Sequence, residues 1–494
     1  MNFSQIIQKN KIQIIILLCM CFVLCASIFV FMEKSLRLDE AQSLFQTNGS
    51  VGVTIQLIAE DIHLPIYFVL LHIWKLIFGS SIFAIRSLSL LFMLAALPAI
   101  YFLGKTAYSK TVGLIAVVFC SLSPFLNWFA SETRMYTLLF LVTSLNQMYF
   151  IRIWQPKKDG NTSNTWLLYM ITTWIGVYTH FFFTFMLAVQ AIFYFTHIKI
   201  FPKNSFKKLA ITGGVSAVML GAWFYLRSIV GSSNSAPLLV PPSSVDVFNV
   251  FSNLIIGFQS ISLNTFFLAL WPLAILLSFT LLTKHRDMTA TTKYFLLSLI
   301  IPITLVFIVS STIRSLFLSR YLIIVMPSLI MLVLLSLTIY SKKTFKYLTI
   351  VLFIFAYSFL MFEAHSSKTP TNENYRGVAA YVTKQAVSSD LFVVTAPFLT
   401  YPVEYYYRGN AKLTTFPIWN RYEEIKQIPR FSEADMIEKF TGWSKDHTKF
   451  YVLMGYDQGY EEKVRLYLDS NYERIEVREF SPKLNLYVYK IKYK

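Results

Sequence analysis

Two adjacent carboxylates follow the first long apolar run of the chain. That run covers residues 12–32, and the motif Arg37-Leu38-Asp39-Glu40 begins shortly after it. A carboxylate beside a membrane can bind a cation, act as a general base or belong to a solvated helix start. Asp39 suits the base role if an acceptor hydroxyl must lose its proton, because a partly dry interface raises the pKa of a carboxylate. From these residues alone, the chemical interpretation and the helix-start interpretation have about equal weight.

Two histidines lie beside apolar runs. His63 precedes Pro65, a residue favoured in the first turn of a helix, so we expect His63 near a helix N-terminus. His180 falls at the turn between two later apolar runs. A lone histidine of this kind is more often a capping or hydrogen-bonding residue. The functional interpretation of His63 is favoured because we expect it on the same face of the membrane as Asp39.

Arginines at the outer ends of predicted spans form a third group. Arg134 lies between Glu132 and Tyr136 in a short connection, and Arg320 precedes Tyr321 at the start of a late apolar run. Glu132 and Arg134 are two residues apart and do not face each other on a helix. Outer arginines oppose the positive-inside rule, and the guanidinium fork matches phosphate. We therefore predict that Arg320 binds an anion, while interfacial snorkelling is an equal alternative for Arg134.

The composition indicates a membrane protein. The 494 residues are 55% hydrophobic and only 14% charged, against roughly 25% charged in a soluble protein. A formal net charge of +18 could indicate nucleic acid, but the basic residues are scattered between apolar runs. We expect the lipid bilayer, and no nucleic acid, as a partner.

The sequence predicts no metal centre and no certain cofactor. The four cysteines lie in apolar runs, without the spacing of disulfides or metal sites. A divalent cation at Asp39 and Glu40 stays open, because carboxylate oxygens suit it but are few there.

Eleven apolar runs are predicted to cross a bilayer, which takes about 17–25 residues. They are 12–32, 82–103, 111–129, 136–153, 165–180, 181–198, 209–230, 263–283, 294–313, 321–340 and 347–362.

A further run, 64–78, is apolar but short and contains His72 and Lys75. If it does not cross, the lysines of the connecting loops fall almost entirely on one side, as the positive-inside rule requires. We therefore predict that it lies on, or re-enters, the outer face. The N-terminus is then cytoplasmic, and the long outer connections 33–81 and 231–262 are expected to be functional.

The composition changes after Phe362. From Lys368 onward the chain has 19 basic and 16 acidic residues, so charge is nearly balanced there. We predict a helical transmembrane domain over 1–363, a linker over 364–374 and an extracytoplasmic α/β domain over 375–494. In the last of these, 375–386 is expected to be a helix, 391–395 and 449–454 buried strands, and 476–492 a hairpin.

Taken in order, the motifs resemble those of a known family, the polytopic glycosyltransferases of the GT-C fold. Within that fold the chain is similar to the dolichyl-phosphate-mannose protein mannosyltransferase group, of the glycosyltransferase family 39 type, and to its bacterial relatives, including lipid A aminoarabinose transferases. The resemblance covers roughly residues 39–322 and does not extend to the C-terminal domain. It rests on Asp39-Glu40, on His63, Pro65 and Tyr67, on Ala84 and Arg86, on Ser123-Pro124, on Glu132, Arg134 and Tyr136, on Tyr178-Thr179-His180 and on Arg320-Tyr321-Leu322.

The resemblance implies transfer of one sugar, with inversion, from a polyprenyl-phosphate carrier to an outer-face acceptor, whether protein, lipid or cell-surface glycan. It implies Asp39 as the base, Glu40 as its neighbour in a catalytic loop, and His63 as an orienting group. Relatives with lysine between the histidine and proline positions can use it on phosphate, whereas Leu64 stands here. The remaining residues implied to line the sugar and phosphate cavity are Glu132, Arg134, Tyr136, His180, Arg320 and Tyr321.

Other classes stay open from the sequence alone. A lipid-sugar transporter would place ionisable groups near the bilayer midplane, whereas only Arg86 lies inside a predicted span. A glycan polymerase or ligase would use the same carrier lipid, and a receptor would bind through its outer domain. We expect a membrane glycosyltransferase.

Overall fold

The computed structural model describes residues 3–61, 63–156, 162–231, 241–258, 288–338, 351, 354–355, 358–359, 373–421 and 429–491. The predicted span 263–283, most of the span 347–362 and most of the linker 364–374 lie outside these residues. The chain divides into two compact units. The helical unit comprises residues 1–31, 63–227 and 238–366, and the sheet unit comprises 32–62, 228–237 and 367–494.

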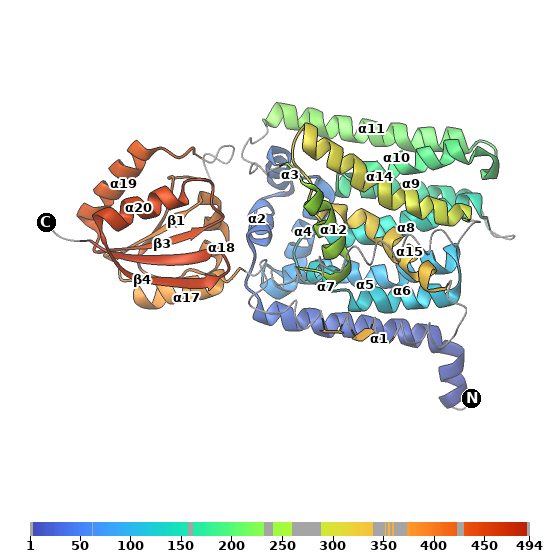
Figure 1. Ribbon diagram of the computed structural model, residues 1–494, viewed down its shortest axis with the longest axis horizontal. Coiled ribbons are helices and arrows are strands. Elements are labelled where there is room, and N and C mark those ends of the chain that lie inside the picture. The colour runs from blue at the N-terminus through green and yellow to red at the C-terminus, as the bar shows by residue number, and fades with distance from the viewer. Residues whose placement is uncertain are drawn as a thin grey trace. The chain divides into compact units, whose positions relative to one another are not determined.

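Helix α5 (Ile82–Ala107) is central to the packing of the helical unit. It packs against α6 (Lys110–Leu122) and α8 (Tyr136–Trp154), and α8 in turn packs against α9 (Thr162–Thr179). The other helices of this unit are α1 (Phe3–Glu33), α4 (Pro65–Phe78), α7 (Pro124–Ala130), α10 (Phe183–Thr196), α11 (Ser205–Val230), α12 (Ser244–Ile256), α14 (Ala290–Thr312) and α15 (Met326–Thr338), as Figure 1 shows.

Several of these helices meet the length and composition needed to cross a membrane. Within the described residues, α5, α11, α14 and the part Asn10–Glu33 of α1 do so singly. The bent pair α6 and α7 adds a fifth candidate. The protein is therefore a multi-pass membrane protein, and the total of eleven crossings stays a prediction.

The predicted span 111–129 contains a break. Helices α6 and α7 meet at 65°, because Ser123 caps the second helix through Leu126 N and Pro124 occupies its first turn. The predicted span 321–340 also changes form, since it begins as the 3-10 helix η2 (Tyr321–Val325) before α15.

The short apolar run predicted at 64–78 forms α4. Its 14 residues span about 21 Å, against roughly 30 Å for the hydrocarbon core of a bilayer. One face buries Tyr67, Phe68 and Leu71, whereas Leu76 and Ile77 are exposed. A short helix with two different faces is consistent with a surface or re-entrant position, which remains a prediction.

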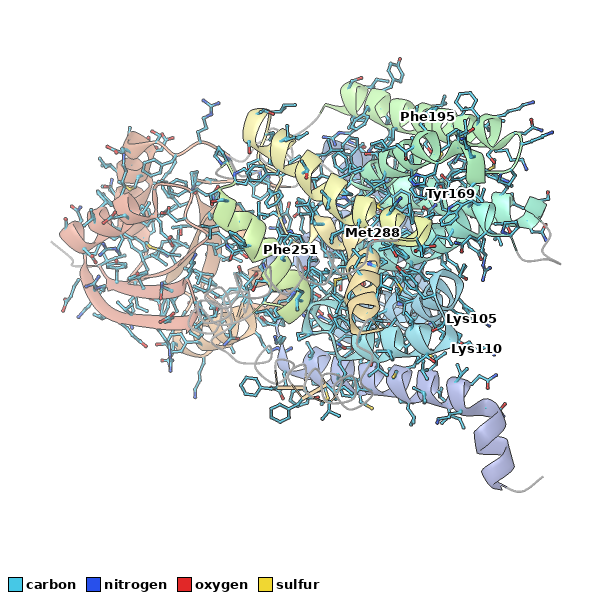
Figure 2. The ribbon with its side chains drawn as sticks, turned by 45° about the vertical axis from the view of Figure 1, so that its right-hand side comes forward. Lys105, Lys110, Tyr169, Phe195, Phe251 and Met288 are labelled. Atoms are coloured by element: carbon cyan, nitrogen blue, oxygen red, sulfur yellow. The ribbon has the colours of Figure 1, made fainter. Side chains whose placement is uncertain are left out.

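A buried polar network joins four helices of this unit. Gln190 of α10 donates to Asn146 Oδ1 of α8 over 2.7 Å and accepts from the hydroxyl of Tyr169 in α9 over 2.7 Å. It also donates to the Tyr294 hydroxyl of α14 over 3.3 Å, and Asn146 donates to Thr173 Oγ1 over 2.9 Å. Figure 2 labels Tyr169 in this bundle. Because unsatisfied polar groups are costly in a dry interior, these bonds hold the four helices in one register.

The sheet unit contains a five-stranded mixed sheet in the order β2-β1-β3-β5-β4. Its strands are β1 (Leu391–Thr395), β2 (Lys412–Phe416), β3 (Lys449–Gly455), β4 (Glu473–Ser481) and β5 (Leu484–Lys490). Strands β2, β1 and β3 are parallel, and the hairpin β4–β5 joins β3 antiparallel. The predicted strands 391–395 and 449–454 and the predicted hairpin are confirmed.

Helices cover both faces of this sheet. One core packs α17 (Tyr375–Gln385) and α18 (Thr400–Tyr406) against the sheet residues Phe392 and Val394. The other core packs α19 (Glu433–Asp446) and α20 (Glu461–Asn471) against Val393. All five side chains of β1 are therefore buried, which explains its continuous apolar sequence.

The segment 32–62 belongs to the sheet unit, although the sequence predicted it as an outer connection of the transmembrane domain. It forms α2 (Leu38–Gln46) and α3 (Val51–Glu60). Helix α2 packs on α18, where the rings of Phe45 and Tyr401 lie 5.1 Å apart and the Arg421 guanidinium lies 5.4 Å from the Phe45 ring. The Leu36 amide donates to the Tyr406 hydroxyl over 2.7 Å.

Candidate functional site

Arg134 and His63 form a buried pair in the helical unit. His63 lies two residues before the start of α4, and Arg134 lies between α7 and α8. Arg134 Nη2 lies 2.8 Å from His63 Nε2. A guanidinium only donates hydrogen bonds, so His63 Nε2 accepts and the neutral imidazole carries its proton on Nδ1. The Arg134 guanidinium also lies 5.8 Å from the ring of Phe68.

Hydrogen bonds from α5 hold the backbone of Arg134 in place. The Ser89 hydroxyl donates to the Arg134 carbonyl over 3.1 Å and accepts from the Tyr67 hydroxyl over 2.8 Å. Thr137 Oγ1 donates to the Ser89 carbonyl over 2.8 Å. These bonds link α4, α5 and α8, so the backbone of Arg134 is fixed by three helices of the bundle.

His180 and Arg320 extend this pair to a cluster. His180 lies within electrostatic range of His63, Arg134 and Arg320. Its Nδ1 accepts from the Phe182 amide over 3.2 Å, so the neutral ring presents Nε2–H as a donor.

The ring of Tyr321 contacts both His180 and Arg320. Its ring centroid lies 5.2 Å from that of His180, and the Arg320 guanidinium lies 5.4 Å from the same ring. The cluster that we call the Arg134–Arg320 cluster is therefore His63, Arg134, His180, Arg320 and Tyr321. Two guanidinium groups with neutral imidazole donors in a largely buried place are suited to an anion, and phosphate fits the arginine fork.

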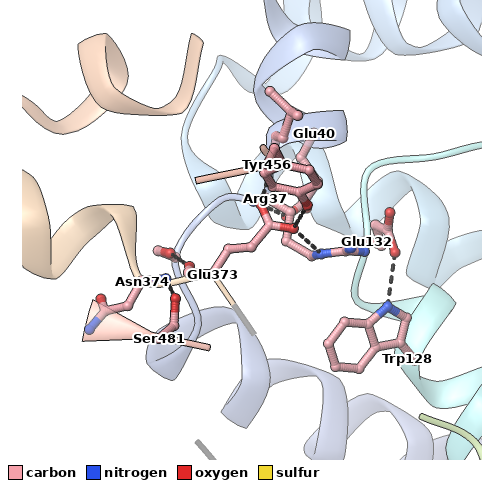
Figure 3. Close-up of polar contacts among 10 residues, drawn as sticks. Arg37, Glu40, Trp128, Glu132, Glu373, Asn374, Tyr456 and Ser481 are labelled. Atoms are coloured by element: carbon pink, nitrogen blue, oxygen red, sulfur yellow. Dashed lines mark hydrogen bonds and ion pairs between the residues drawn. The ribbon is translucent and has the colours of Figure 1, made fainter. Parts of the chain in front are cut away.

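Glu132 lies on the connection that carries Arg134, Tyr136 is the first residue of α8, and both are buried. The Trp128 indole donates to Glu132 Oε2 over 3.0 Å, a bond visible in Figure 3. The ring of Tyr136 lies 4.7 Å from that of Phe129. Both residues therefore contact α7, and they support the position of Arg134 between them.

Asp39 and Glu40 lie in the first turn of α2, in the sheet unit. Glu40 is 1% exposed, and its Oε2 accepts from the Arg37 amide over 3.0 Å. This bond is the helix-capping role of a glutamate at the third position of a helix. Asp39 is only half-buried. Of the two adjacent carboxylates, Asp39 is therefore the one more exposed to solvent.

Glu373 holds the N-terminus of α2, and the sequence placed it in the predicted linker. Its Oε2 accepts from the Leu38 amide over 2.9 Å, and its Oε1 pairs with Arg37 Nε over 3.2 Å. The Tyr456 hydroxyl donates to Glu373 Oε1 over 2.6 Å (Figure 3). The pattern of residues around Glu373 does not predict this role, because the partners of Glu373 are more than 80 residues away in the sequence.

Within the described ranges, no group of three or more His, Cys, Asp or Glu residues is arranged to hold a metal ion.

The comparisons with known proteins agree with this architecture. Residues 63–224 match the model of the dolichyl-phosphate-mannose-protein mannosyltransferase family. The structure of ArnT from Cupriavidus metallidurans in the apo state superposes with a TM-score of 0.60 at 13% identity, covering 96% of this chain and 97% of that one. The chain has the GT-C fold.

Further GT-C structures extend this likeness. The same ArnT bound to undecaprenyl phosphate gives a TM-score of 0.59 at 13% identity, with coverage of 96% and 97%. An oligosaccharyltransferase from Archaeoglobus fulgidus with a tethered acceptor peptide gives 0.51 at 12% identity, covering 99% of this GT-C chain and 74% of that one. Curated protein sequences give no significant match. Together the family model and the fold support a membrane glycosyltransferase.

Proposed function

We propose that this GT-C protein transfers a single sugar from a polyprenyl-phosphate-linked donor to an acceptor hydroxyl at the outer face of the membrane. The observation that carries the proposal is the Arg134–Arg320 cluster, in which two guanidinium groups both lie within electrostatic range of His180, because guanidinium groups suit a lipid-linked phosphate. Two GT-C neighbours support it, because one binds undecaprenyl phosphate and another, AglB from Archaeoglobus fulgidus, was determined with a dolichol-phosphate.

In this reaction the acceptor oxygen bonds to the anomeric carbon of the donor. The bond between that carbon and the phosphate oxygen breaks, and polyprenyl phosphate leaves with the bonding electrons. Negative charge grows on the departing phosphate, and arginines already oriented in a dry site stabilise it without reorganising. Arg134 and Arg320 have this role in our proposal.

Asp39 takes the proton of the acceptor hydroxyl in our proposal. Its half-buried carboxylate is more accessible than that of Glu40, which caps α2. A single attack from the face opposite the phosphate inverts the anomeric configuration. Glu40 then orients the turn that carries the base.

His63 is assigned an orienting role and not that of the base. Its Nε2 accepts from Arg134, so this nitrogen is engaged while the guanidinium stays in place. His180, with Nε2–H as a donor, is assigned to the sugar or phosphate oxygens.

The decisive experiment presents the protein, reconstituted in lipid nanodiscs, with polyprenyl-phosphate sugars radiolabelled in the sugar, together with a cell-envelope fraction as acceptor. We expect label to leave the lipid and join the acceptor for one sugar of the series. A transporter would move the label across a vesicle membrane without detaching it. Label that stays on the lipid for every sugar tested would contradict the proposal.

A further inference from the structure

The sheet unit contains a cleft at the carboxyl end of β3. It has a volume of about 720 Å³ and lies among the end of β3, the first turn of α20 and the tight turn of the β4–β5 hairpin. Met454 and Leu484, both almost fully buried, belong to its lining. In sheets with parallel strands, ligands bind in crevices beyond the carboxyl ends of the strands. This cleft has that position, and no residue of the Arg134–Arg320 cluster takes part in it.

Carboxylates dominate the α20 side of the cleft. Asp457 Oδ1 accepts from the amides of Gly459 and Glu461 over 2.8 and 3.2 Å, which fixes the loop before α20. Arg465 forms ion pairs with Glu462 over 3.7 Å and with Asp469 over 3.3 Å. No ion pair reaches the Glu461 side chain within the part of the chain that the structure describes.

The environment of Glu461 is unfavourable for its charge. Burial, together with the nearby charge of Asp457, raises the pKa of Glu461 to about 7. A ligand that donates hydrogen bonds to this carboxylate would relieve the cost of desolvation, whereas an anionic ligand would increase it.

Tyrosine rings, amides and the cationic Lys483 of the hairpin turn form much of the remaining lining. Tyr456 is 44% exposed, and Tyr487 of β5 is half-buried. Tyr456 has the left-handed backbone conformation, with φ of 57°, and its hydroxyl is tied to Glu373, so its ring is held in place. Gln458 and Asn485 add amide groups that both donate and accept.

We propose that this cleft is a carbohydrate-binding site for an oligosaccharide that carries no acidic groups. Each sugar ring carries several neighbouring hydroxyls that donate and accept hydrogen bonds. The carboxylates of the cleft can accept from these hydroxyls, and the amides can both donate to them and accept from them. The faces of Tyr456 and Tyr487 match the apolar face of a sugar ring. A metal ion is the less suitable occupant, because no group of three or more potential metal ligands occurs among the residues described.

The test measures binding to the full-length protein in nanodiscs by saturation-transfer difference NMR and isothermal titration. The probes are a neutral chitotetraose, a neutral cellotetraose and an acidic tetragalacturonate. We expect a neutral probe to bind and the acidic probe to bind at least tenfold more weakly. Binding should strengthen as pH rises through about 7, since an ionised carboxylate accepts stronger hydrogen bonds.

Two cleft variants and one control variant test whether binding occurs in this cleft. Glu461→Gln should weaken binding about tenfold and remove its pH dependence, and Tyr487→Ala should weaken it severalfold. Glu433→Gln, on the exposed surface of α19, should bind as the parent does. Thermal unfolding of each variant establishes that it is folded.

Three outcomes would overturn the proposal: no binding of either neutral probe, preferred binding of the acidic probe, or parent-like binding by both folded cleft variants. The assay contains no lipid-linked donor. Its failure therefore leaves the transferase proposal unaffected, and failure of sugar transfer leaves this site unaffected.

Discussion

Arg134 Nη2 donates to His63 Nε2 over 2.8 Å, across 71 residues of sequence. The bond sets the tautomer of the imidazole and the direction of the guanidinium together, so neither residue acts alone. Because the Arg134 carbonyl is held by Ser89, both groups are positioned before any ligand arrives. Preorganised donors of this kind are the ones that stabilise charge most effectively as it develops.

Removal of either guanidinium should weaken use of the donor. Arg134→Ala and Arg320→Ala are each expected to raise the donor concentration for half-maximal transfer by roughly tenfold to a hundredfold, because a charge-assisted bond to phosphate is lost. Lysine at either position should restore only part of the effect, since it lacks the fork. Arg314→Ala, at an exposed arginine before the same 3-10 helix, is the control. Normal donor dependence in both alanine variants would place the phosphate elsewhere.

Asp39→Asn tests the base. The change keeps the size of the side chain but removes its basicity, so the rate of transfer should fall roughly a hundredfold or more. Donor binding and folding should be preserved. Glu40→Gln should cost less, because the amide oxygen can still accept from the Arg37 amide. Near-normal transfer by Asp39→Asn, measured at saturating donor, would show that another group takes the proton.

Glu373→Ala tests the anchoring of α2 within the sheet unit. The change removes the acceptor for the Leu38 amide and leaves the mostly buried Arg37 without this carboxylate. We expect a loss of about 3 kcal/mol in unfolding free energy, measured by thermal or denaturant unfolding. Glu433→Gln breaks an exposed pair with Lys463 and should cost about 0.5 kcal/mol. Equal effects of the two changes would contradict the anchoring role.

Glu461 should make stability depend on pH. Its folded pKa of about 7 is higher than the ordinary value of 4.5, so the folded protein binds the proton more tightly than the unfolded chain. The contribution of this group is therefore fully present below about pH 4.5 and is lost as pH rises through 7. Melting temperatures from pH 5 to 8 should show a parent curve that falls relative to Glu461→Gln. Parallel curves would mean that the carboxylate is solvated as in the unfolded chain.

The position of α4 in the membrane can be tested by labelling. Single cysteines at Ser50 and Ser80, in a background without Cys19, Cys21, Cys25 and Cys120, should react with an impermeant reagent from the same outer side. The reason is that 14 helical residues are too short to cross, and the charge bias of the loops favours a surface position. Reaction from opposite sides would replace the eleven-span topology.

Properties that depend on neighbouring residues were predictable from the sequence. Apolar runs long enough to cross a bilayer identify α5, α11 and α14 because the energetic preference for lipid is summed along one continuous segment. The continuous apolar stretch of β1 and the alternation of the β4–β5 hairpin are local in the same sense. The resemblance to the GT-C family implied that His63, Arg134, His180 and Arg320 line one cavity, and their shared role stays a prediction.

Only the tertiary structure decided how those residues meet. The bond between Arg134 and His63, and the capping of α2 by Glu373 across 335 residues, arise from the packing of whole helices and strands. The break at Pro124 and the placement of segment 32–62 in the sheet unit have the same origin. Sequence spacing specifies which side chains share a helix face, whereas contacts between elements depend on the energy of the assembled core, which no short stretch of sequence contains.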